Sequence, residues 1–174
     1  MDVLLIVCLT LLNGVFAMSE MALASSRKAR LAALAESGDG GAHAALRLLD
    51  QPTQFLSTVQ IGITSIGVLN GIVGEAAFSD DFSYWLLAQG VPDTVASGLA
   101  TAFVVTLITF STILFGELVP KRIGQLFPES VARVAAPVML ALATLAKPFV
   151  HLLSASTSGM LKLLRIDVHG ARTV

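Results

Sequence analysis

The stretch Phe115-Gly116-Glu117-Leu118-Val119-Pro120-Lys121-Arg122 places a carboxylate, a proline and two cations directly after an apolar run, residues 95–114. That run is long enough to cross a bilayer. Lipid cannot solvate an ionised carboxylate, so Glu117 should face protein, water or a cation. Pro120 has no amide hydrogen and disturbs the carbonyl of Gly116. A carboxylate beside backbone oxygens suits a hard cation, but the same residues also fit a helix that simply ends at the membrane interface.

The composition indicates an all-α membrane protein. The chain has 174 residues, of which 13% are charged, and a mean hydropathy of +0.80; soluble domains average roughly a quarter charged residues. The net charge of -1 argues against nucleic acid as a partner, and one cysteine leaves no intrachain disulfide. Because the sequence has no glycine-rich phosphate loop, no HExxH and no CxxC, nothing in it predicts an enzyme.

Hydropathy predicts three transmembrane helices, at residues 3–26, 53–77 and 95–119. Residues 78–94 contain no Lys or Arg, whereas Arg27, Lys28, Lys121 and Arg122 follow the first and third spans. Because positive loops stay in the cytoplasm, the N-terminus should lie outside and the C-terminus in the cytoplasm. We expect the membrane to be the plasma (inner) membrane.

The rest of the chain predicts juxtamembrane helices on the cytoplasmic face, at residues 28–50 and 129–165. Residues 131–153 are long enough to span, but they contain Arg133 and Pro137, and a crossing would leave the last cations outside. We therefore expect kinked helices that lie along the membrane or dip into it.

The second predicted span is rich in glycine. Gly67, Asn70, Gly71 and Gly74 fall on one helical face. Such a face could pack against another helix with Asn70 as an interhelical hydrogen-bonding group. Alternatively, the helix loosens near Gly67 and exposes a carbonyl beside the Asn70 side chain.

The first span carries polar residues in its second half. Glu20 is an acid inside the apolar window. Ser25 lies roughly 120° around the helix from Ser19, so the two could serve one site only across a bulge or an unwound turn. The alternative is that the serines hydrogen-bond back to their own helix.

Three segments together carry a family resemblance. They are Ser19-Glu20-Met21-Ala22 with Ser25-Ser26, Thr64 to Gly74, and Gly116-Glu117-Leu118-Val119-Pro120-Lys121. With them the chain resembles, over essentially its whole length, the transmembrane domain of the CorC/CNNM family of magnesium transporters. In that family cytoplasmic CBS domains follow this region; the sequence stops at Val174 without them, so we expect a single transmembrane domain, residues 1–174.

The resemblance implies a homodimer with three spans and a belt of juxtamembrane helices in each protomer. It also implies export of Mg²⁺ coupled to Na⁺ entry, through a Mg²⁺ site in a polar cavity open to the cytoplasm. The implied ligands are Ser19, Ser25, the carbonyl of Gly67, Asn70 and Glu117, with Glu20, Glu75 and Lys121 lining the same region. The irregular turn between Ser19 and Ser25 then becomes an expected feature.

A second function fits the same residues. A membrane scaffold that senses divalent cations, without moving them, would use the same site. In either case we expect the dimer to pack through the second and third spans, where small residues allow close helix approach.

Overall fold

The computed structural model describes residues 1–163, which are almost entirely helical and contain no strand. The helices are α1 (Asp2–Ser25), α2 (Lys28–Glu36), α3 (Gly40–Asp50), α4 (Pro52–Ala88), α5 (Asp93–Ile113), the π-helical turn η1 (Leu114–Leu118), α6 (Val119–Leu126), α7 (Pro128–Leu145) and α8 (Lys147–Leu163).

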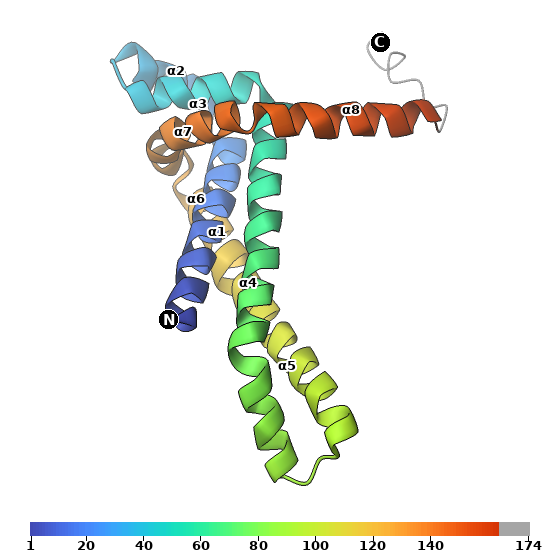
Figure 1. The fold of residues 1–174 in the computed structure, drawn as a ribbon. Helices are drawn as coiled ribbons and strands as arrows, with labels where there is room; N and C mark the ends of the chain where they lie inside the picture. The colour runs from blue at the N-terminus through green and yellow to red at the C-terminus, as the bar shows by residue number, and fades with distance from the viewer. Residues whose placement is uncertain (164–174) are drawn as a thin grey trace.

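The helices form a bundle with a cross-layer at one end (Figure 1). α4 packs against α1 and α5, and the chain returns through η1 and α6 along the face of α1. Helices α2, α3, α7 and α8 run across the end of the bundle where α1 finishes. The return of η1 and α6 onto α1 brings together polar residues about a hundred positions apart in sequence.

Within residues 1–163, four helical segments are long and apolar enough to cross a membrane: Asp2–Ser25, Pro52–Ala88, Asp93–Leu126 and Pro128–Leu145. Their outer faces expose large apolar side chains such as Leu4, Ile72 and Phe110. These features indicate a multi-pass membrane protein in a lipid bilayer. Pro128–Leu145 adds a candidate to the three that hydropathy predicted, although Figure 1 shows α7 lying crosswise to α1 and α4.

The helix that contains the second predicted span extends well beyond residue 77. α4 continues to Ala88 and includes Asp80 and Asp81, both exposed, inside the helix rather than in a polar loop. The reversal comes later, at Gly90, whose φ of 89° is readily adopted by glycine. The predicted loosening near Gly67 is also not seen, because α4 is one continuous α-helix.

The cross-layer is fixed by polar contacts as well as by apolar packing. The Asp39 carboxylate accepts a hydrogen bond from the Ala42 backbone N–H, at 2.9 Å, and so caps α3. It also pairs with Arg133 of α7, Nε to Oδ2 2.7 Å. The Ala42 hydrogen bond, with help from Arg133, lowers the pKa of Asp39 below its ordinary value.

Glycines permit close helix approach in the bundle, and Gly124 and Gly74 are two examples. A Cβ on Gly124 of α6 would lie 2.5 Å from the Met18 carbonyl oxygen of α1. A Cβ on Gly74 of α4 would lie 2.6 Å from a side-chain carbon of Ile108 of α5. Small residues therefore set how closely α6 approaches α1 and α5 approaches α4.

Candidate cation site

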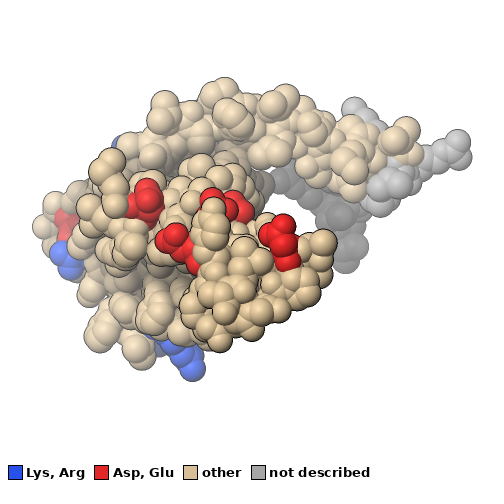
Figure 2. Space-filling view, turned by 60° about the horizontal axis from the view of Figure 1, so that its bottom comes forward, with Lys and Arg blue, Asp and Glu red and all other residues tan. Residues whose placement is uncertain are grey.

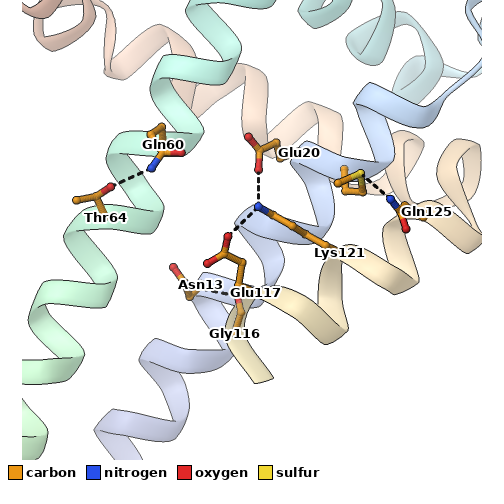
Figure 3. A network of polar contacts seen from close by, with 9 residues as sticks. Asn13, Glu20, Gln60, Thr64, Gly116, Glu117, Lys121 and Gln125 are labelled. Carbon is orange, nitrogen blue, oxygen red and sulfur yellow. Dashed lines mark hydrogen bonds and ion pairs between the residues drawn. The ribbon is translucent and has the colours of Figure 1, made fainter. Parts of the chain in front are cut away.

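Two carboxylates from different elements converge on one ammonium group (Figure 3). Lys121 Nζ of α6 lies 2.9 Å from Glu117 Oε1 of η1 and 3.4 Å from Glu20 Oε2 of α1. All three side chains are partly buried, with exposed fractions between 20% and 33%. Two carboxylates and one ammonium give this cluster a formal charge of -1, which favours the approach of a cation.

The π-helical turn places Glu117 at this point. Pro120 cannot give an N–H to the Gly116 carbonyl four residues earlier, and the helix widens over Leu114–Leu118. Asn13 of α1 fills the gap, because its Nδ2 donates to the Gly116 oxygen at 3.0 Å. A side chain of α1 thus satisfies the backbone that the proline leaves open.

A cavity of about 180 Å³ adjoins this turn. Its lining comes from four elements: Asn13 of α1, Ile63, Gly67 and Gly71 of α4, Ile108, Thr109, Thr112 and Ile113 of α5, and Glu117 of η1. Gly67 and Glu117, two of the predicted ligands, therefore line the same space. The oxygen groups around it are one carboxylate, an amide and two hydroxyls, which are hard ligands of the kind Mg²⁺ accepts.

Asn70 is fully buried and ties three helices together. Its Nδ2 donates to Thr10 Oγ1 of α1 at 2.8 Å and to Thr112 Oγ1 of α5 at 2.7 Å. The Asn70 Oδ1 atom is buried without a hydrogen-bond partner in the described part of the chain. Asn70 therefore acts as the interhelical hydrogen-bonding group that one of the two sequence interpretations predicted. Its Oδ1 atom remains a hydrogen-bond acceptor without a partner in the described residues.

Comparison with known proteins identifies the family of this chain. The model of the Cyclin M (CNNM) transmembrane N-terminal domain matches residues 3–174. The chain belongs to the CNNM family. The resemblance read from the three sequence segments is thereby confirmed.

The relatives of this CNNM domain include proteins with different names. It is 42% identical over 95% of its length to UPF0053 protein sll0260 of Synechocystis, and 36% identical over 96% of its length to a polyamine export protein of Salmonella typhimurium. It is 39% identical over 81% of its length to the polyamine export protein of Escherichia coli K12. The chain covers 37%, 37% and 32% of these proteins, respectively.

Other predicted ligands of the CNNM domain lie apart from the cavity. Ser19 is fully buried, and its hydroxyl donates to the Val15 carbonyl of its own helix at 2.6 Å. Ser25 is exposed at the end of α1, which is an unbroken α-helix; the irregular turn expected between the two serines is absent, and the π-helical irregularity lies in η1 instead. The structure therefore does not bring Ser25 to Glu117.

Glu75 lies in the C-terminal half of α4. It is eight residues beyond Gly67, about 12 Å along the helix. Its Oε1 accepts from Thr101 Oγ1 at 3.4 Å, and that hydroxyl also bonds Ser79 at 2.8 Å. Glu75 belongs to this second polar contact between α4 and α5 rather than to the cluster at Glu117.

A second groove, larger than the cavity beside Glu117, borders Glu20. Its volume is about 610 Å³, and its walls are Glu20, Leu56, Ser57, Gln60, Ile61, Thr64, Ser65 and Leu153. Gln60 Nε2 bonds Thr64 Oγ1 across one turn of α4, at 3.2 Å (Figure 3). Glu20 thus faces both the Lys121 ammonium and a groove of mixed polarity.

Sequence reasoning missed Asn13. The signal was present, because Asn13 and Glu20 are seven residues apart and lie about 20° from each other around a helix. They therefore mark one polar face of α1, which is the face that η1 and α6 cover. No group of three or more His, Cys, Asp or Glu side chains that could hold a metal occurs within residues 1–163, so a cation here would need amide, hydroxyl or carbonyl oxygens as well.

Proposed function

We propose that this CNNM domain carries a cation across the plasma membrane, and that the cation is Mg²⁺, exported as Na⁺ enters. The observation that carries the proposal is the convergence of Glu20 and Glu117 beside a cavity with neutral oxygen groups. An intramembrane carboxylate is costly in lipid, and a cationic substrate gives it a role. The family membership and the polyamine export proteins among the relatives support transport as the activity.

The charges of the site suit an ion that binds and is released in transport better than a tightly bound structural ion. Mg²⁺ prefers six oxygens in octahedral geometry and retains several waters. Glu117 would supply charge, while the side chains of Asn13, Thr109 and Thr112 in the same lining carry neutral oxygens. The Lys121 ammonium offsets part of the carboxylate charge. Moderate affinity follows, and an ion held moderately can leave.

The distribution of charge supports the proposed orientation. The chain has no Lys or Arg between Arg47 and Lys121. Figure 2 looks toward the tip of the bundle, where acidic side chains are clustered and basic ones appear only at the margin. By the positive-inside rule this tip lies outside, and the cross-layer lies in the cytoplasm as a belt around a homodimer. In this arrangement α1, α4 and α5–α6 are the three spans.

A polyamine is the second candidate substrate. The Lys121 side chain is itself a primary alkylammonium seated between two carboxylates, which is the group a polyamine would present. The groove beside Glu20 combines a carboxylate with apolar walls, as an alkyl chain with ammonium ends requires. Two relatives that cover most of this chain are named polyamine export proteins.

Flux from liposomes tests these functions together. The chain is reconstituted in vesicles loaded with Mg²⁺ or with spermidine, in the presence or absence of an opposing Na⁺ gradient. We expect Mg²⁺ to leave, faster with the gradient, and Glu117→Gln to slow it at least tenfold. Thr106→Ala is the control, because the Thr106 hydroxyl is exposed and bonds only to the Ala102 carbonyl of its own helix.

Three other outcomes would revise the proposal. Efflux of spermidine without Mg²⁺ would assign the polyamine. Efflux of Mg²⁺ that ignores Na⁺ would remove the coupling. Binding of Mg²⁺ with no flux of any ion would favour the cation-sensing scaffold.

A further inference from the structure

Asn13 has an unusual position among the polar residues of α1. Its side chain is buried, with an exposed fraction of 2%. Its Oδ1 atom has no hydrogen-bond partner in the described residues, although its Nδ2 is engaged. Buried amide oxygens are nearly always satisfied, so an unpaired one indicates a bound water or ion.

The direction of this amide is fixed by chemistry. A carbonyl oxygen can only accept, so the Gly116 carbonyl requires the NH₂ end of the Asn13 side chain. Flipping the amide would place two oxygens against each other. The Oδ1 atom must therefore point away from Gly116, and Figure 3 shows it on the side that faces α4.

The same residue lines the cavity that contains Glu117, Gly67 and Thr112. The carbonyl of Gly116, to which Pro120 cannot donate, already accepts a hydrogen bond from Asn13 Nδ2. In exchange, Asn13 presents a neutral hard oxygen of its own beside the Glu117 carboxylate.

We propose that Asn13 Oδ1 is a ligand of the transported cation, holding it together with Glu117. This inference rests on the proposed Mg²⁺ function and adds a ligand from the first span, a role that Ser25, exposed at the end of α1, does not fill here. The π-helical turn positions this ligand, because the Gly116 carbonyl in the turn orients the amide.

The difficulty in testing Asn13 is its double role. Asn13→Ala removes the candidate ligand and also leaves the Gly116 carbonyl unpaired. Pro120→Ala separates the two roles, because it restores an N–H at position 120 that can reach the Gly116 carbonyl within the helix. Asn13→Ala is therefore made both in the wild-type chain and in the Pro120→Ala variant.

Calorimetric titration with Mg²⁺ gives the readout, with circular dichroism and gel filtration to verify folding. We expect Asn13→Ala to weaken Mg²⁺ binding at least tenfold in both backgrounds. Ser79→Ala is the control, since Ser79 is equally buried in α4 but bonds Thr101 away from the cavity, and it should bind as the wild type does.

Two results would overturn the inference. One is wild-type affinity in Asn13→Ala. The other is a loss that disappears in the Pro120→Ala background, which would reduce Asn13 to a partner for the Gly116 carbonyl. A wild-type chain that binds no Mg²⁺ would instead refute the proposed function.

Discussion

Replacing Gly124 with alanine should push α6 off α1. The added Cβ would lie 2.5 Å from the Met18 carbonyl oxygen and 3.1 Å from the Ala22 backbone nitrogen. Both are backbone atoms of a helix and cannot rotate away. Ordinary contact begins at 3.4 Å, so the helices must separate by about 0.9 Å, the difference between 3.4 Å and 2.5 Å. Overpacking of this kind costs about 1–3 kcal/mol.

The separation would also reach the candidate site. Lys121 is three residues before Gly124 on α6, and its Nζ lies 3.4 Å from Glu20 Oε2 on α1. A displacement of about 0.9 Å directed along this contact would lengthen it beyond the roughly 4 Å of an ion pair. We therefore expect Gly124→Ala to lower the thermal unfolding temperature in detergent and to change Mg²⁺ affinity as well.

Gly98→Ala is the matched control for Gly124→Ala. Gly98 lies on the exposed face of α5, where an added Cβ meets nothing within 4 Å. Alanine there should be neutral or stabilising by about 0.5–1 kcal/mol, because glycine is unfavourable inside a helix. Both variants are melted in parallel by circular dichroism. If Gly124→Ala melts at or above the wild-type temperature, the close approach of α6 to α1 is wrong.

Three further predictions concern the cross-layer, the dimer and the orientation. The pKa of Asp39 is lowered, so its carboxylate stabilises the fold above the ordinary Asp pKa and loses that effect as the pH falls through the lowered folded-state pKa. Asp39→Asn mainly removes the charge at the α3 cap beside the Ala42 N–H. This variant should therefore have a lower thermal unfolding temperature than the wild type at pH 7 and the same one in acid. Gly71→Leu should weaken dimers in detergent, because it adds bulk to the second span, where small residues are expected to allow close packing in the dimer. An unchanged dimer mass in light scattering would exclude an interface through Gly71. Lys121→Cys in a Cys8→Ala background should resist impermeant thiol reagents added outside, and rapid labelling from that side would reverse the topology.

Hydropathy and charge predicted a membrane protein because they indicate whether a segment is surrounded by lipid or by water. Apolar runs of about twenty residues predicted spans at the positions of α1, α4 and α5. The break between α2 and α3 falls at Gly38, which adopts a φ of 94° that disfavours other residues. The far end of α4 could not be predicted, because Asp80 and Asp81 are polar in sequence yet remain helical, and polarity alone does not end a helix.

The site was only partly predictable, for a physical reason that Gly116 illustrates. Local chemistry shows that Pro120 leaves the Gly116 carbonyl without an N–H, and this much follows from eight residues of sequence. Which group fills the vacancy depends on how η1 packs against α1, a contact between residues 103 positions apart. Until that packing is known, either a cation or a side-chain amide could be the group that contacts the Gly116 carbonyl. The Asn13 amide donates to that carbonyl, and its own Oδ1 atom on α1 is left without a hydrogen-bond partner in the described residues. In the proposed site, the face of α1 that carries Asn13 and Glu20 supplies the oxygens of the first span.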